Sequence, residues 1–252
     1  MSLESFKLLA AVSIWIVALI GAGFSKRLIE QTTQGAFLSL ANCFAGGVFL
    51  AAGLIHVLPD SQGQLAVAFP NVDYPLFGLI ATAAVTVMVF IDRLGQRQSN
   101  TDASGVAAAI LFLILSIHSV ITGFALGVEN QSVAAIALLI AVLAHKGTAT
   151  FALGLKVRPV SNTATQFNLR MLAFSLTTPL GVVVGLSLLH RLSSTQAPMM
   201  EGIFDAIAAG TFIYVAIFEI LSPEFDKAKH PFGQVITMIL GAGLMAVVAL
   251  WT

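Results

Sequence analysis

Eight long apolar runs account for nearly the whole chain, and they limit its fold more than any other feature. A helix needs about 20 apolar residues to cross a hydrocarbon core about 30 Å thick. The runs lie at about 5–24, 38–58, 75–94, 106–127, 131–154, 169–190, 203–222 and 233–251. They are continuous rather than alternating, which favours helices over barrel strands. Because only 10% of the residues are charged, we predict an all-α, multi-pass integral membrane protein with one transmembrane domain, residues 1–252.

Basic residues predict which helix ends face the cytoplasm, because cytoplasmic loops carry an excess of Lys and Arg. If the N-terminus is outside, only Lys7 and Arg191 lie on the outer side. The basic residues on the inner side are then Lys26, Arg27, Arg93, Arg97, Lys156, Arg158, Arg170, Lys227 and Lys229. We therefore predict that both termini are outside. The formal net charge of zero gives no indication of a nucleic-acid partner.

Two histidines within the apolar runs begin similar segments. His118 and His145 are each followed, at the same offset, by Phe-Ala-Leu-Gly, which ends at Gly127 and Gly154. At about 1.5 Å per residue, each histidine lies about 13 Å from a helix end, and the two ends are on opposite membrane faces. Both histidines are therefore expected near the middle of the membrane, on antiparallel helices. Inverted repeats about an axis in the membrane plane have this arrangement.

A second pair of similar segments carries His56 and Glu219. Each of these residues lies nine positions after a glycine, Gly47 or Gly210, and the two predicted helices again run in opposite directions. His56 is expected toward the outer side and Glu219 toward the inner side. Polar residues repeated in this way inside a membrane indicate a transport pathway.

Imidazole and carboxylate groups together suit Zn²⁺ and other divalent ions of the first transition row. The candidate metal ligands are therefore His118, His145, His56 and Glu219. For any one of the histidines, a simple hydrogen bond to a neighbouring helix stays an alternative. No residue pattern in the chain calls for a separate cofactor, so the metal is expected to be the transported substrate.

The candidates for a supporting role near these ligands are Asp60, Ser119 and Thr122. Asp60 lies four positions after His56 and is expected either to attract cations at the mouth or to be an ordinary carboxylate at a helix end. Pro59 disfavours a helical Leu58 and is expected to loosen this end of the helix. Ser119 and Thr122 can orient His118 by hydrogen bonds, or bond back to helix carbonyls instead.

Lys146, next to His145, is the only basic residue near the middle of a predicted span. An ammonium group opposes the binding of a divalent ion, but it can occupy the position of a second cation and neutralise Glu219 or another acid. We therefore predict a single-metal site with a tethered positive charge beside it. The alternative is that Lys146 points elsewhere.

Five segments of the chain resemble the ZIP (Zrt/Irt-like protein) family of divalent metal transporters. They are Cys43-Phe-Ala-Gly-Gly-Val-Phe-Leu-Ala-Ala-Gly-Leu-Ile-His-Val-Leu-Pro-Asp60, His118-Ser-Val-Ile-Thr-Gly-Phe-Ala-Leu-Gly127, His145-Lys-Gly147, Phe174-Ser-Leu-Thr-Thr-Pro-Leu-Gly181 and Ala209-Gly-Thr-Phe-Ile-Tyr-Val-Ala-Ile-Phe-Glu-Ile-Leu221. The resemblance implies eight helices and a metal site between the fourth and fifth. It also implies uptake of divalent metal, usually zinc, into the cytosol by an elevator-like movement, and it implies homodimers.

The family pattern assigns metal-ligand roles to His118, His145, His56 and Glu219, and this chain departs from it in two ways. Many members have a carboxylate four residues after each of the two central histidines, often in a two-metal centre, whereas Thr122 and Ala149 stand there in this chain. The sequence His-Lys-Gly resembles a branch with lysine in the fifth helix, which agrees with one metal. The usual histidine-rich loop is missing.

These observations predict alternating-access transport of Zn²⁺ toward the cytoplasm, with Fe²⁺, Mn²⁺ and Cd²⁺ as other candidate substrates. The plasma membrane is the expected location. The expected partners are the metal ion, the lipid bilayer and a second copy of the chain. One alternative is an intramembrane zinc-dependent hydrolase, in which His118, His145 and Glu219 bind zinc and activate water. A helical membrane scaffold is the other alternative.

Overall fold

A computed structural model describes residues 2–31, 35–98, 103–188, 196–226 and 230–250, and helix is the only regular secondary structure in these ranges. The α-helices are α1 (Leu3–Gln31), α2 (Gly35–Ala51), α3 (Leu58–Ala68), α4 (Leu76–Gln98), α5 (Ala103–Val128), α6 (Ser132–Val157), α7 (Ala164–Ser175), α8 (Thr177–Leu188), α9 (Gln196–Tyr214), α10 (Ser222–Phe225) and α11 (Pro231–Val248). Two π-helical segments, η1 (Ala52–Val57) and η2 (Val215–Leu221), continue α2 and α9 without a break.

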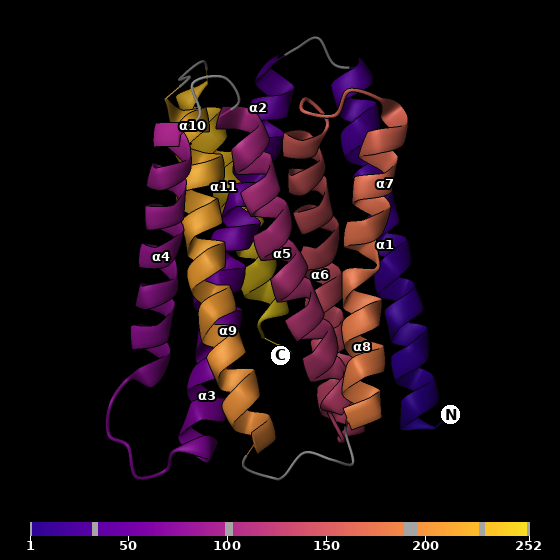
Figure 1. Cartoon of the computed structure of the whole chain (residues 1–252), viewed down its shortest axis with the longest axis vertical. Coiled ribbons are helices and arrows are strands. Elements are labelled where there is room, and N and C mark those ends of the chain that lie inside the picture. The colour runs from indigo at the N-terminus through magenta and orange to yellow at the C-terminus, as the bar shows by residue number, and fades with distance from the viewer. Residues whose placement is uncertain (1, 32–34, 99–102, 189–195, 227–229, 251–252) are drawn as a thin grey trace.

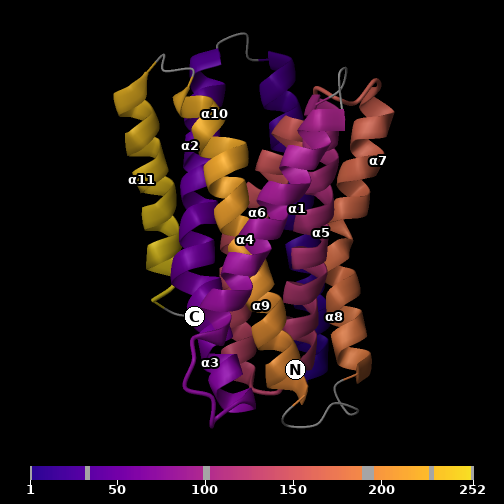
Figure 2. The ribbon, with the colours of Figure 1, turned by 60° about the vertical axis from the view of Figure 1, so that its left-hand side comes forward.

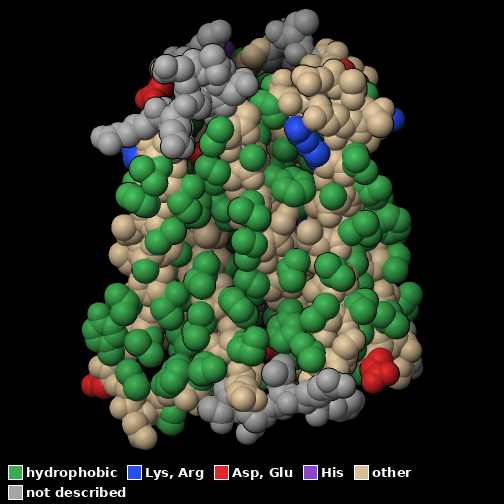
Figure 3. All heavy atoms as spheres, in the orientation of Figure 1, with side chains coloured by type: hydrophobic (Ala, Val, Ile, Leu, Met, Phe, Trp, Pro, Cys, Tyr) green, Lys and Arg blue, Asp and Glu red, His purple; other side chains and the backbone are tan. Residues whose placement is uncertain are grey.

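The described helices form eight segments that are long and apolar enough to cross a membrane. They run side by side along the long axis of the molecule (Figure 1). Hydrophobic side chains cover the middle of the visible face, and its Lys and Arg side chains lie near the upper end (Figure 3). Because large apolar side chains such as Phe90, Leu113 and Ile239 are exposed, this surface suits lipid rather than water. The prediction of an all-α protein with eight membrane-spanning helices is confirmed.

Both chain ends lie toward the lower end of the bundle, where α1 begins (Figure 1). Following the predicted orientation, we name this the outer end and the opposite one the inner end. The orientation itself stays a prediction, and three of the basic residues on which it rests, Arg191, Lys227 and Lys229, lie outside the described residues.

The helices divide into two groups by their contacts. In the α5–α6 bundle, α1, α5, α6, α7 and α8 pack closely on one another, and in the α2–α9 bundle, α2, α3, α4, α9 and α11 do the same. Contacts between the two bundles are sparser. Figure 2 shows α11 and α2 at one edge of the molecule and α7 and α8 at the opposite edge. The molecule therefore has a seam between two compact halves.

Glycines allow the close contacts inside each bundle. A Cβ atom on Gly47 of α2 would collide with the carbonyl oxygen of Met238 in α11. A Cβ atom on Gly210 of α9 would collide in the same way with the carbonyl oxygen of Ala81 in α4. Helix backbones approach this closely in membranes where small residues line the contact. The two glycines that pair the sequence segments therefore fix their helices to partners within the same bundle.

A π-helical turn precedes a proline in both of these segments. The backbone N–H of Leu58 donates to the carbonyl of Gly53 just before Pro59, and the N–H of Ser222 donates to the carbonyl of Ile217 just before Pro223. The wider turn accommodates the proline ring, which would otherwise clash with the preceding turn of an α-helix. The second span therefore continues to Ala68 instead of loosening near Leu58, and the expectation that Pro59 weakens this end is wrong.

The glycine contacts predict a stability difference between two alanine substitutions. In Gly123→Ala, the new Cβ would collide with the carbonyl oxygen of Thr178 in α8, whereas nothing lies within 4 Å of the corresponding position at Gly78. Overpacking typically costs about 1–3 kcal/mol. We expect Gly123→Ala to lower the thermal unfolding midpoint of the purified protein by several degrees.

Gly78→Ala is the matched control. It should leave the midpoint unchanged or slightly raised, because alanine favours a helix over glycine by about 1 kcal/mol. Equal midpoints for the two variants would contradict the proposed packing of α5 on α8.

Candidate metal centre

His118 of α5 and His145 of α6 face each other inside the α5–α6 bundle. Their ring centroids are 5.8 Å apart and the ring planes are inclined by 57°. Each residue is only 5% exposed. The two helices run in opposite directions, so the equal offsets found in the sequence place the two rings at the same depth. The structure therefore brings together the two histidines that the sequence paired.

One ring nitrogen of each histidine has no visible partner. Nδ1 of His118 and Nδ1 of His145 are buried, and neither makes a hydrogen bond with any residue that the structure describes. Buried polar atoms without a partner are rare and costly, so each calls for an explanation. On a tetrahedral zinc ion with Zn–N bonds of about 2.0–2.1 Å, two imidazole centres lie about 5 Å apart. The observed pair could hold one ion after a small movement.

The phenyl ring of Phe212 in α9 covers the two imidazoles from the other bundle. Its centroid lies 4.1 Å from that of His118 and 6.0 Å from that of His145. Phe212 is fully buried. The imidazole pair therefore lies at the seam between the bundles, against an aromatic side chain of the α2–α9 bundle.

Thr122 and Ser119, both next to His118, have different partners. The Thr122 hydroxyl lies 3.2 Å from Nε2 of His118 and also donates to the His118 backbone carbonyl, so both predicted uses of this side chain occur. The Ser119 hydroxyl accepts a hydrogen bond of 2.8 Å from Nζ of Lys146 and is not bonded to the imidazole. Thr122 therefore contacts Nε2 of His118, and Nδ1 of the same ring stays available to a ligand.

Lys146 is buried beside the imidazole pair, with 2% of its surface exposed. Besides the bond to Ser119, its Nζ lies 4.1 Å from the centroid of Phe174, which is cation–π distance. Both contacts are inside the α5–α6 bundle. The structure pairs Glu219 with Lys156 and not with Lys146. The expectation that Lys146 neutralises Glu219 is therefore wrong, because its side chain points toward α5 and α7.

His56 and Asp60 lie together at the outer side of the seam. Nδ1 of His56 is 3.1 Å from a carboxylate oxygen of Asp60, and Asp60 is 42% exposed whereas His56 is buried. The pairing expected from their spacing is present, since the helix continues through Pro59. Both residues line an outer cavity of about 480 Å³, together with Glu129, Glu201 and Asp205. This cavity is rich in carboxylates and leads toward His56.

Glu219 lies at the inner side, in η2, and is linked to the α5–α6 bundle by Lys156. Nζ of Lys156 donates to the Glu219 backbone carbonyl at 2.7 Å and lies 3.5 Å from a carboxylate oxygen of the same residue. Pro223, four residues later, has no N–H to offer that carbonyl. The Tyr214 hydroxyl donates to the other carboxylate oxygen at 3.4 Å. Lys156 thus connects the two bundles across the inner part of the seam.

The four predicted ligands are not gathered around one point in this conformation. Among the described residues, no three His, Cys, Asp or Glu side chains form a group that could hold a metal ion. The structure brings His118 and His145 together, whereas Glu219 is held by Lys156 and His56 is held by Asp60. The assignment of all four as metal ligands stays a prediction.

Several residues at the seam were not found from the sequence. Phe212 lies within a segment that carries the family resemblance, but a phenylalanine in an apolar run looks like ordinary core. Asp205 gave a signal that could have been used, since it is a carboxylate inside the predicted seventh span. Glu201 is four residues earlier and therefore on the same helical face.

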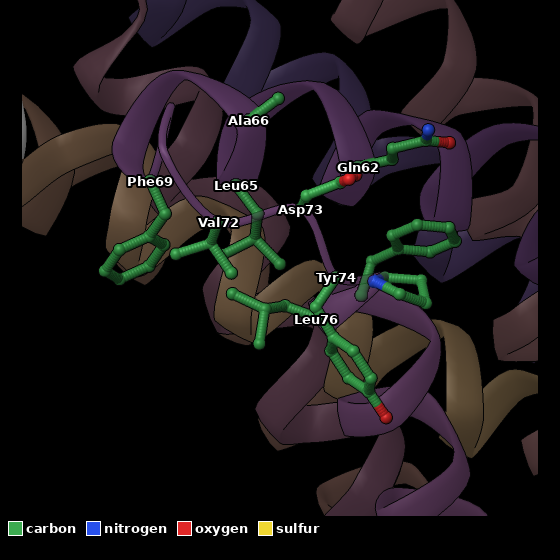
Figure 4. Close-up of a pocket in the computed structure, with 10 residues that line it drawn as sticks. Gln62, Leu65, Ala66, Phe69, Val72, Asp73, Tyr74 and Leu76 are labelled. Carbon is green, nitrogen blue, oxygen red and sulfur yellow. The ribbon is translucent and has the colours of Figure 1, made fainter.

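A further cavity, of about 380 Å³, lies beside the loop between α3 and α4 (Figure 4). Its lining includes Leu65, Phe69, Val72 and Leu76. It contains none of the predicted metal ligands and is a surface hollow at the outer end, separate from the seam.

Comparison with known proteins gives matches over nearly the whole chain. A sequence model of the family described as ZIP Zinc transporter matches residues 4–102 and 94–249. Zinc transporter 3 of Arabidopsis thaliana is 27% identical, over 98% of this chain and 85% of its own length. Zinc transporter ZIP2 of Mus musculus is 27% identical over 85% of each chain. Fe(2+) transport protein 1 of Arabidopsis thaliana is 26% identical, over 97% of this chain and 85% of that protein.

Proposed function

The chain belongs to the ZIP zinc transporter family, and from this premise we propose that it carries divalent metal ions, above all Zn²⁺, through the membrane toward the cytoplasm. The observation that carries the proposal is the buried pair of imidazoles, His118 and His145, with an unpartnered Nδ1 on each ring. Family membership makes the protein a transporter and not an enzyme, which argues against the hydrolase alternative.

The ion reaches the imidazole pair from the outer cavity. Carboxylates in a cleft with low-dielectric walls raise the local concentration of cations, and Asp60, Glu201 and Asp205 line this cavity. His56 lies between the carboxylates and the seam. It is three residues after Gly53, which packs closely on Phe212. A Cβ atom added to Gly53 would lie only 3.2 Å from the Cβ atom of Phe212. These positions support a role for His56 in passing the ion from the carboxylates to His118 and His145.

Release on the inner side requires Lys156 to leave Glu219. The Lys156 contacts to the carbonyl and carboxylate of Glu219 join the two bundles. Once they open, the Glu219 carboxylate can accept the ion. We propose that the α5–α6 bundle slides against the α2–α9 bundle in an elevator-like movement, because contacts inside each bundle are dense and those between them are sparse. From family resemblance alone, we also propose a homodimer in the plasma membrane.

Replacing either imidazole should abolish transport. We expect His118→Ala and His145→Ala each to lower the initial rate of ⁶⁵Zn²⁺ uptake into cells or sealed vesicles to near background, because one histidine cannot replace the ligand set. Competition by Fe²⁺, Mn²⁺ and Cd²⁺ in the same assay ranks the substrates. The control is Thr237→Ala, which removes a hydroxyl that donates to two nearby backbone carbonyls of its own helix, α11. Wild-type uptake by both histidine variants would refute the site, whereas the absence of uptake by the unmodified protein would favour a helical scaffold.

Removing the buried ammonium group should change how tightly the ion is held. A positive charge beside the imidazoles repels a divalent ion, so in Lys146→Ala we expect a severalfold lower KM for Zn²⁺ and a lower kcat, because release becomes slower. Ser119→Ala, which keeps the charge but removes its hydrogen-bond acceptor, should have a smaller effect. If Lys146→Ala left rate, metal preference and the number of bound ions unchanged, the tethered-charge proposal would be wrong.

Neutralising two carboxylates of the outer cavity should slow uptake only when zinc is scarce. For Glu201→Gln with Asp205→Asn, we expect a lower uptake rate at low Zn²⁺ and low ionic strength. The deficit should shrink at high salt, because salt screens steering charges. The rate at saturating Zn²⁺ should be nearly unchanged. The matched control, Glu4→Gln with Asp73→Asn, removes the same number of carboxylates from exposed positions away from this cavity. Equal effects of the two double variants would exclude a specific role for the cavity.

A further inference from the structure

Two phenylalanines at the centre of the molecule occupy equivalent positions in the paired segments. Phe49 lies two residues after Gly47 and seven before His56, and Phe212 lies two residues after Gly210 and seven before Glu219. Each comes three residues before a π-helical turn. Their rings pack edge to face, with centroids 5.1 Å apart and planes inclined by 77°. The sequence pairing therefore corresponds to a direct contact between the two equivalent side chains.

The aromatic pair is attached to the α2–α9 bundle. Gly47 holds the helix of Phe49 against α11, and Gly210 holds the helix of Phe212 against α4. The histidines belong to the other bundle, where Gly127 holds α5 against α8 and Gly154 holds α6 against Ser25 of α1. A sliding movement between the bundles would therefore carry the imidazoles past a pair of rings that stay in place.

Only one of the two rings contacts the histidines in this conformation. Phe212 lies 4.1 Å from His118 and 6.0 Å from His145, measured between ring centroids. Among the described ring contacts, Phe49 touches Phe212 and neither imidazole. With the predicted orientation, the cavity on the outer side and the Lys156 link on the inner side correspond to an outward-facing conformation. The contact between Phe212 and His118 therefore belongs to the outward-facing state.

We propose that Phe49 and Phe212 are positioning residues that cover the imidazole pair in turn, Phe212 in the outward-facing state and Phe49 in the inward-facing state. The inverted pairing exchanges Phe212 with Phe49 and His118 with His145. The inward-facing counterpart of the Phe212–His118 contact is thus a Phe49–His145 contact. This inference rests on the elevator-like movement proposed above and adds to it the side chains that balance its two end states.

The physical reason is that an aromatic ring against an imidazole supplies packing and excludes water. Because the ring lost in one state is replaced by an equivalent ring in the other, the two states keep similar energies. The edge-to-face pair also fills the centre of the seam in both states, which would prevent an open pore. Removing one ring should therefore destabilise one state and favour the other.

The experiment measures how accessible the outer cavity is when either ring is truncated. The reporter is Ala137→Cys, at a cavity-lining position, in a Cys43→Ser background because Cys43 is the only native cysteine. A membrane-impermeant maleimide is applied to the full-length protein in intact cells and in inverted membrane vesicles, with a chelator so that no metal biases the states. We expect Phe212→Ala to lower the labelling rate and Phe49→Ala to raise it. Each change should be about two- to tenfold, which is the shift in a conformational equilibrium expected from the loss of one aromatic contact.

Phe151→Ala is the matched control, since it removes a buried ring that packs on Phe24 away from the histidines, and it should leave labelling unchanged. Shifts in the same direction for Phe49→Ala and Phe212→Ala, or no shift for either, would overturn the inference. If the alanine variants do not reach the membrane, Phe49→Leu and Phe212→Leu are compared in the same way. The labelling assay does not depend on metal transport. If the wild type took up no Zn²⁺ but the two variants still shifted labelling in opposite directions, the proposed function would be refuted and this inference would stand.

Discussion

In a hydrocarbon solvent, polar atoms find partners only inside the protein, and this constraint determines how the whole molecule is arranged. Backbone groups are satisfied within helices, and glycine-lined contacts then bring those helices together in two compact bundles. The buried polar side chains of functional interest lie at or beside the seam between the bundles. Most of them are paired, as Lys146 is with Ser119. The Nδ1 atoms of His118 and His145 are among the buried side-chain atoms that have no partner in the described part of the chain, and the proposed metal site follows from them.

The two halves of the seam use the same structural devices in opposite orientations. In each half, a glycine packs on a neighbouring backbone, a phenylalanine reaches the centre, a π-helical turn follows, and a proline comes two residues after the last residue of that turn. The polar residue carried by the turn is His56 on the outer side and Glu219 on the inner side. Similar construction with different chemistry at the two ends suits a pathway that admits an ion on one side and releases it on the other.

The eight spans could be predicted from the sequence because their length and apolar composition are set by membrane thickness, whatever the packing. The meeting of His118 and His145 could also be predicted, since equal offsets on antiparallel helices give equal depth. Side-chain partners could not, because they depend on how each helix is rotated about its axis. For that reason Lys146 was expected near Glu219 but lies against Phe174, and Lys156 was counted only as a loop charge. The helix through Pro59 was missed because a π-helical turn has no clear sequence signal.

Pro223 has a consequence that reaches beyond the shape of η2. It deprives the Glu219 carbonyl of its usual helical donor, so this residue presents a backbone oxygen as well as a carboxylate to the seam. Lys156 takes up both oxygens with a single ammonium group. Carbonyl and carboxylate oxygens are also common ligands of hard and borderline divalent cations. In the mechanism proposed above, the lysine and a departing metal ion would therefore compete for the same two acceptors, and release at the inner side would exchange one cation for another.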